Sequence, residues 1–225
     1  MIYNRKCLMG LAGAALALYP VFAGATVTYN TWTSNENPNG NYILTVTDIG
    51  TQFNWNLTVN PWNAEALGLF VDLGNADVPD PSGVSLTDVN PAGQVTVYAT
   101  DTTSDVCGEG CNLNGLSPPL MGGDWELVFR LGAQGYDGIQ TFSWTTPNFG
   151  LTESAFGVVG IRAQQLCTGT QATLPPDTNC TGSDKVYGSP GTPTTPPTGI
   201  PEPTTSALLG LGMLALGAIR RRKAT

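Results

Sequence analysis

Residues 51–59 read Thr-Gln-Phe-Asn-Trp-Asn-Leu-Thr-Val, and apolar and polar side chains alternate strictly along this stretch. Every second residue from Phe53 to Val59 is apolar, so these side chains share one face of an extended strand, because successive side chains of a strand point to opposite sides. The intervening Gln, Asn and Thr side chains share the other face. The stretch therefore predicts a strand with one buried face and one face in water.

Similar short runs recur along the chain, each bounded by clusters of Gly, Pro, Asn or Asp. Seven or more such strands predict an all-β fold, an antiparallel β-sandwich of the jelly-roll or Ig-like kind. Only residues 61–66 suggest a helical turn, because Ala and Glu favour helix and Gly68 would end it. Besides residues 51–59, the predicted strands are 42–47, 67–73, 94–100, 125–131, 139–145 and 156–163.

Histidine is absent from the 225 residues, which excludes whole classes of catalytic site. Ser-His-Asp and Cys-His nucleophilic sites, imidazole acid/base catalysis and His-ligated metals all need this side chain. A glycosidase that works with two carboxyl groups is the common hydrolytic mechanism that the composition leaves open.

Charge is distributed very unevenly along the chain. The whole chain carries 9 basic and 17 acidic residues, but residues 26–199 hold three of the basic and sixteen of the acidic side chains, a net charge of −13. Such a surface repels the phosphates of nucleic acids. We therefore expect no nucleic-acid partner.

The N-terminus has the pattern of a secretory signal peptide. Two basic residues open the chain and are followed by the apolar run 8–18, by Pro20, and by small residues at Ala23 and Ala25. This order predicts a signal helix in residues 1–25 that signal peptidase removes after Ala25. A retained membrane anchor is the alternative interpretation.

The C-terminus has three parts in a fixed order. Pro201, Glu202 and Pro203 precede the apolar run 207–219, and a basic cluster follows. Thirteen helical residues extend only about 20 Å, short of the roughly 30 Å hydrocarbon core. Basic residues stay on the cytoplasmic side of a membrane, which places residues between the two ends on its far side. The basic cluster consists of Arg220, Arg221, Arg222 and Lys223.

This tail resembles the PEP-CTERM sorting signal of Gram-negative bacteria that make exopolysaccharide, because all three parts match in order. The resemblance covers about 25 residues. It implies that the chain is exported through the inner membrane and is a substrate of exosortase, a transpeptidase-like cysteine protease thought to act near the Pro-Glu-Pro motif. The apolar helix would hold the protein at the membrane only transiently. An ordinary tail anchor that is not cleaved is the alternative.

Four segments follow from these patterns. Residues 1–25 are the predicted signal peptide, and residues 26–187 the β-sandwich domain. Residues 188–203 contain six of the 17 prolines and predict an extended linker that includes the Pro-Glu-Pro motif. Residues 204–225 form the predicted hydrophobic sorting helix and basic tail.

Four cysteines remain after removal of the signal peptide, and an even number in an exported chain indicates disulfides. Three connectivities are open. Proximity in sequence favours Cys107–Cys111 and Cys167–Cys180, each of which would staple a loop poor in apolar residues. A four-cysteine metal site is the alternative, although the spacings do not match those of zinc ribbons.

Asp124 and Glu126 are the best-spaced pair of carboxylates for a glycosidase. At positions i and i+2 of a strand they share a face, where Arg130 could pair with Glu126, whereas Trp125 and Leu127 would face the core. No apolar pocket that would raise the pKa of either carboxyl group is evident in the sequence. The favoured interpretation is a charged face exposed to solvent, and we expect no catalytic residues.

Oxygen-bearing side chains also cluster after residue 71, where calcium could bind through Asp72, Asn75, Asp77 and Asp80. Their spacing does not match an EF-hand loop, so turn formation is the favoured explanation and we expect no cofactor. Trp32 and Trp62 could stack on sugar rings if they are exposed, although a core role is commoner for aromatic residues.

Together these features predict an exported, non-enzymatic protein with a structural or binding role at the cell surface or in the exopolysaccharide matrix of a biofilm. A carbohydrate-binding module that contacts extracellular polysaccharide is the first alternative, and a glycosidase with a carboxylate pair is the second.

Overall fold

The computed structural model describes residues 24–34, 39–167 and 180–194. These residues contain short strands and two single 3₁₀ turns, at Pro81–Gly83 and Glu153–Ala155. The strands are β1 (Thr26–Tyr29), β2 (Thr33–Ser34), β3 (Tyr42–Asp48), β4 (Gln52–Val59), β5 (Glu65–Val71), β6 (Thr87–Asn90), β7 (Val95–Thr102), β8 (Trp125–Leu131), β9 (Thr141–Pro147), β10 (Val159–Leu166) and β11 (Gly182–Gly188).

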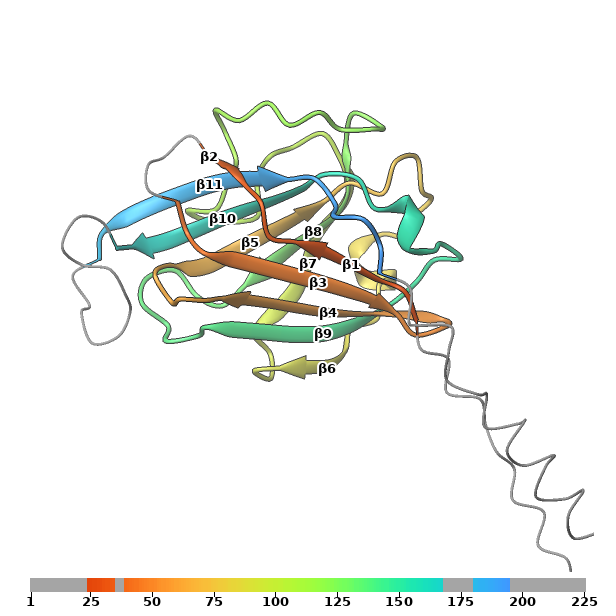
Figure 1. Cartoon of the computed structure of the whole chain (residues 1–225), viewed down its shortest axis with the longest axis horizontal. Coiled ribbons are helices and arrows are strands. Elements are labelled where there is room, and N and C mark those ends of the chain that lie inside the picture. Colours follow the sequence, from red (N-terminus) through yellow and green to blue (C-terminus); the bar gives the residue numbers. More distant parts are fainter. Residues whose placement is uncertain (1–23, 35–38, 168–179, 195–225) are drawn as a thin grey trace, which may run out of the picture. The chain divides into compact units, whose positions relative to one another are not determined.

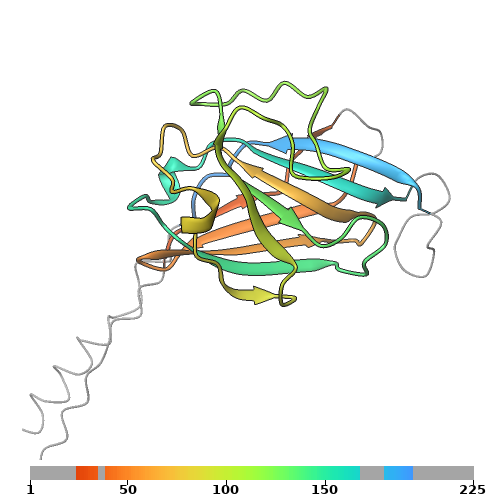
Figure 2. The same ribbon diagram turned by 180° about the vertical axis from the view of Figure 1, so that it is seen from behind.

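The strands form two antiparallel sheets that pack face to face (Figures 1 and 2). The first sheet has the order β1-β3-β4-β9-β6, and the second has the order β2-β11-β10-β5-β8-β7. Neighbouring strands in both sheets run antiparallel. The predicted all-β, antiparallel sandwich is therefore confirmed.

The main core lies between the sheets and is built from alternating side chains, as strand β4 illustrates. Phe53, Trp55, Leu57 and Val59 are all buried, whereas Asn54 is exposed on the other face. The Trp55 ring stacks on Trp144 of β9 at 5.7 Å between centroids and lies 5.6 Å from Phe129 of β8. The predicted orientation of β4 is thus correct.

The helical turn predicted for residues 61–66 is wrong. Strand β5 begins at Glu65, which pairs with Gln164 of β10, and Ala66 pairs with Ala163. The Glu65 carboxylate is buried and accepts the backbone N–H groups of Asp137 and Gly138 at 3.1 and 2.8 Å. Sheet pairing and this polar contact outweigh the helix preference of Ala and Glu, which amounts to only a few tenths of a kcal/mol per residue.

A second apolar cluster lies outside the sandwich, on the outer face of the second sheet. It combines Phe70 of β5 with Trp125 and Val128 of β8, and the loop 103–124 covers them. The disulfide Cys107–Cys111 belongs to this cluster. Because of this cover, strands β5 and β8 are buried on both faces.

Gly68 of β5 makes room for this cover. A side chain at position 68 would overlap the sulfur atoms of Cys107 and Cys111. The disulfide can therefore lie directly against the sheet only where the strand presents no Cβ atom.

The other disulfide joins Cys167 to Cys180, so both bridges have the pairing that sequence proximity favours. Both of its cysteines are buried, and Trp62 packs against them. Trp62 is half-buried, and its packing lies around this bridge and against the main core.

The chain leaves β11 and crosses to the first sheet, where residues 189–194 lie along β1. We call these residues the C-terminal strap. Thr194 and Thr26 exchange backbone hydrogen bonds of 3.0 and 3.3 Å, and the Gly191 N–H donates to the Thr28 carbonyl at 2.9 Å. Residues 189–194, which belong to the predicted linker, are thus attached to the domain.

Several predictions fall outside the described residues. They concern the signal helix with Ala23, and the sorting helix with the motif Pro201-Glu202-Pro203 and Arg220–Arg222. Ala25 is described, and its carbonyl accepts the backbone N–H of Asp48 at 3.0 Å. Within residues 24–34, 39–167 and 180–194, no helix has the length and apolar character needed to span a membrane.

Candidate functional site

A polar hollow of about 430 Å³ lies beside the start of β3 and forms a candidate site in the described part of the chain. Its wall comes from three separate segments, which are the connection between β1 and β2, the residues leading into β3, and the residue after β4. We call it the asparagine pocket. Its lining residues are Asn30, Thr31, Trp32, Asn39, Gly40, Asn41, Tyr42, Ile43 and Asn60.

Trp32 is fixed at the wall of this pocket. Its indole N–H donates to the Tyr42 carbonyl at 2.8 Å, and its ring lies 5.9 Å from that of Tyr42, edge to face. The ring also stacks near Tyr29 at 6.4 Å. Trp32 is half-buried, and a large aromatic surface held in one orientation costs little entropy when a ligand packs on it.

A buried carboxylate supports the floor of the pocket. Asp184 of β11 accepts hydrogen bonds from the Ser34 hydroxyl at 2.6 Å, the Gly40 N–H at 2.7 Å and the Tyr42 hydroxyl at 3.0 Å. Burial, reinforced by the charge of Asp184, raises the pKa of Tyr42 well above its ordinary value. Tyr42 therefore stays protonated as a donor, and Asp184 orders the residues that enter β3.

Backbone contacts hold the asparagines around the mouth in place. The Asn41 N–H donates to the Asn63 side-chain oxygen at 3.0 Å, and the Asn63 amide donates to the Asn39 carbonyl at 3.3 Å. The Asn60 N–H donates to the Asn41 carbonyl at 2.9 Å. Within the described residues, the side-chain amides of Asn39 and Asn60 take no part in this network, so they can form hydrogen bonds with a ligand in the pocket.

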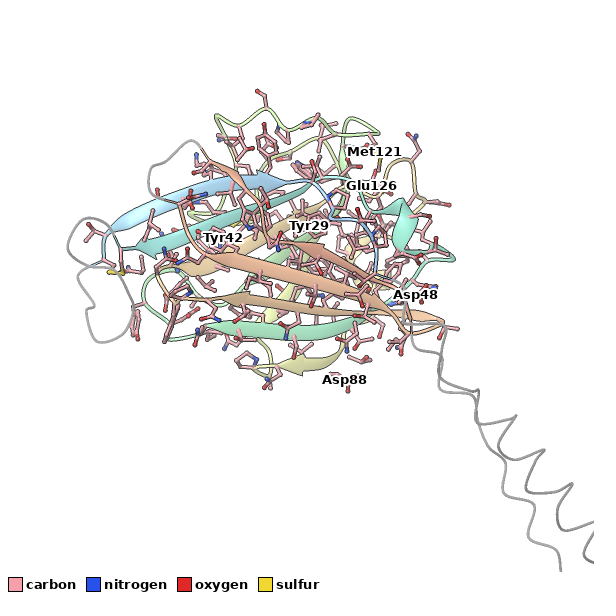
Figure 3. The ribbon with its side chains drawn as sticks, viewed as in Figure 1. Tyr29, Tyr42, Asp48, Asp88, Met121 and Glu126 are labelled. Carbon is pink, nitrogen blue, oxygen red and sulfur yellow. A yellow bond between two sulfur atoms is a disulfide. The ribbon has the colours of Figure 1, made fainter. Side chains whose placement is uncertain are left out.

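The predicted carboxylate pair lies elsewhere, toward the opposite end of the strands (Tyr42 and Glu126 in Figure 3). The expectation of a solvent-exposed face is wrong for Glu126, which is only 1% exposed. Its carboxylate accepts the Leu73 N–H through a short hydrogen bond. Burial, with a smaller contribution from the charges of Asp72 and Asp124, raises the pKa of Glu126 to about 7.

The predicted neighbours of this pair also differ in the structure. Trp125 belongs to the outer apolar cluster, whereas Leu127 lies in the main core, so the two do not pack together. The guanidinium of Arg130 donates a hydrogen bond of 3.0 Å to the backbone carbonyl of Glu109. The sequence could not show that a distant loop covers this strand.

The predicted calcium ligands are not gathered into one site. Asp72 is fully buried and accepts backbone N–H groups from Gly74 and Met121, each at 2.8 Å. Asn75, Asp77 and Asp80 are exposed. In the described ranges, no group of three or more acidic or cysteine side chains is arranged to hold a metal ion.

The sequence identified Trp32 as a candidate contact but missed the asparagines of the pocket. The available signal was the density of Asn residues between positions 30 and 41, which also fits a simple turn. Asn60 joins the pocket because β3 and β4 form a hairpin-like pair in which Tyr42 lies opposite Val59.

Comparison with protein families gives one match, to the PEP-CTERM protein-sorting motif over residues 199–223. This match agrees with the predicted sorting signal and lies outside the described residues. No curated protein and no solved structure shows significant similarity to the chain.

Proposed function

From the premise that this chain carries a PEP-CTERM sorting signal, and so is an exported protein that exosortase processes, we propose that its β-sandwich has a non-enzymatic structural or binding role outside the cell. The location is the surface or exopolysaccharide matrix of a Gram-negative bacterium. Signal peptidase and exosortase are its processing partners, and the membrane holds it only until the tail is cleaved.

Two features of the described domain support a role without catalysis. The most strongly perturbed carboxyl group, Glu126, is buried and bound to the backbone, so it has no access to a substrate. The asparagine pocket is lined by uncharged residues. The proposal includes no cofactor and no nucleic-acid partner.

The proposal rests on the sorting signal, so substitutions in that signal test it. We expect the combined variant Glu202→Ala, Arg220→Ala, Arg221→Ala and Arg222→Ala to accumulate as full-length protein in the membrane fraction of cells that contain exosortase. Immunoblots of membrane and extracellular fractions measure this. A matched control, Glu109→Ala, removes an exposed acidic residue of the domain and should be sorted normally. Normal processing of the combined variant would contradict the proposal.

A second candidate function, carbohydrate binding, is favoured by the chemistry of the asparagine pocket. Amide side chains donate and accept hydrogen bonds at once, as sugar hydroxyls do, and the Trp32 ring can cover the apolar face of a sugar. The volume of about 430 Å³ lies within the range of small-molecule sites. Because the lining is uncharged and the domain is strongly acidic, a neutral polysaccharide fits better than an acidic one.

Binding assays on neutral polysaccharides test this candidate with matched variants. We expect Trp32→Ala and Asn60→Ala to reduce retention on a glycan array at least several-fold. Tyr98→Ala and Asn54→Ala replace an exposed aromatic residue and an exposed asparagine outside the pocket, so they should bind normally. Equal loss in all four variants, or binding that none of them changes, would exclude the pocket as the binding site.

A further inference from the structure

The C-terminal strap joins the end of the described domain to its beginning. Thr26, the first residue after the predicted signal cleavage site, pairs with Thr194 through two backbone hydrogen bonds. A third bond, from Gly191 to Thr28, extends the contact along β1. The strap side chains themselves are exposed, so these backbone bonds are the main attachment that the structure shows.

The two partners of this contact stand at opposite ends of the domain. Strand β1 begins at Thr26, and the strap follows β11, the last strand along the described chain. Strand β11 pairs with β10 in the second sheet, whereas β1 belongs to the first sheet. The strap therefore lies on β1 only where both sheets are in their folded arrangement, so its docking reports on the folded domain.

Docking also shortens the chain between the folded domain and the sorting motif. From Thr194 to Pro201 there are seven Cα-to-Cα steps, which span at most about 25 Å. If the strap detached, the free segment would start at Gly188, and thirteen steps would reach about 45 Å. The docked strap thus removes almost half of the available reach.

We infer that the C-terminal strap is a positioning element for processing: by pairing with β1 in the folded domain, it sets a short, fold-dependent reach for the sorting motif. The inference rests on exosortase processing of the chain. It concerns the length of chain between the folded domain and the sorting motif, and not the chemistry of cleavage. Shortening this length should therefore reduce processing only while the strap is docked.

A deletion and a pair of prolines test this dependence in the full-length chain. Deleting residues 195–198 leaves the matched family motif intact and cuts the docked reach to about 10 Å. The double variant Gly191→Pro, Thr194→Pro removes both N–H groups that the strap donates to β1, and with them two of the three backbone hydrogen bonds, so it should detach the strap. Thr192→Pro is the matched control, because no backbone hydrogen bond of the strap uses its N–H.

Immunoblots for full-length and processed protein in exosortase-containing cells give the result. We expect the deletion alone, or with Thr192→Pro, to lose most of the processed product. The deletion combined with Gly191→Pro and Thr194→Pro should regain it, because detachment returns the reach to about 30 Å. Hydrogen exchange of residues 24–29 in the purified chain should increase in the double-proline variants and remain slow in the control.

Two outcomes would overturn the inference. One is equal processing of the deleted chain whether its strap is docked or detached. The other is loss of processing in both of these variants. If the proline variants fail to fold, inserting Gly-Ser-Gly-Ser after Thr194 of the deleted chain replaces them; restored processing supports the inference and continued loss contradicts it. Failure of the proposed function itself is distinguishable, because the unaltered chain would then remain unprocessed.

Discussion

Strands β4 and β8 show how similar sequence patterns lead to different surroundings. In β4, buried and accessible residues alternate, whereas six of the seven residues of β8 are buried. The difference comes from the loop 103–124, which covers the outer face of β8 and leaves the outer face of β4 open. Alternation therefore identifies a strand and one of its buried faces, but a distant loop decides whether the second face is also buried.

The largest effect in this comparison should come from the core that both strands share. Replacing Trp55 of β4 by Ala removes the stacking on Trp144 and leaves a cavity between the sheets. We expect a loss of about 3–5 kcal/mol in the free energy of unfolding, measured by urea denaturation with the disulfides intact. A loss below about 1 kcal/mol would show that the sandwich core does not carry the stability of the domain.

A smaller, pH-dependent effect on the free energy of unfolding should distinguish the covered strand β8 from β4. The pKa of Glu126 is raised to about 7, so the folded state binds its proton more tightly than the unfolded state does. The stabilisation is complete below the unfolded pKa of about 4.5 and is lost as the pH rises through 7, a change of about 3 kcal/mol.

Glu126→Gln should remove this dependence. We expect its free energy of unfolding to stay nearly level between pH 4.5 and 8 relative to the parent protein and to exceed that of the parent at pH 8. Denaturation curves across this pH range measure the difference. The same slope in both proteins would assign the pH dependence to other groups.

The disulfide over β8 should couple to the outer cluster and not to the inner core. Val128 packs in the same cluster as Cys107 and Cys111, whereas Leu57 lies in the main core. In a double-mutant cycle, Val128→Ala and the pair Cys107→Ala, Cys111→Ala should show a coupling of about 1 kcal/mol. The cycle with Leu57→Ala should show coupling near zero. Equal coupling in both cycles would mean that the two clusters respond as one unit.

The smallest effect should come from the open face of β4. Asn54 is exposed and lies opposite the side that packs against the second sheet. Asn54→Thr should change the free energy of unfolding by less than about 0.5 kcal/mol. A larger loss, measured in the same denaturation assay, would indicate that this face is covered as the outer face of β8 is.

Sequence patterns predicted those strands whose apolar residues alternate or cluster. The predicted range 125–131 coincides with β8, and the predicted β3 and β4 differ from the structure by one residue. Strand β1 was missed although Val27 and Tyr29 alternate with polar residues, because four residues are too few to show a pattern. Strands β2 and β6 were missed because they are very short and polar. Strand β11 was missed because it contains Asp184 and Lys185; the carboxylate is buried only because Ser34, Gly40 and Tyr42 satisfy it.

The candidate site was harder to predict than the fold. The asparagine pocket collects residues from three segments, and nothing local to Asn60 indicates that it meets Asn39 and Trp32. The prediction of an exposed carboxylate pair was wrong for a different reason. Glu126 lies in β8 as predicted, but Asp124 precedes the first residue of that strand, so the two do not form an i, i+2 pair within it. The accessibility of Glu126 in turn depends on a covering loop that the sequence of the strand does not reveal.

The arrangement of the outermost strands has a consequence for contacts between copies of this protein. Unpaired backbone groups along a long, flat sheet border can recruit a neighbouring copy and start aggregation. Here β1 is occupied by the C-terminal strap, β2 has only two residues, and β6 and β7 are irregular in register. The borders at β1, β2 and β6 therefore offer little continuous backbone for another copy to pair with, and the eight-residue β7 is the longest edge strand among the described residues.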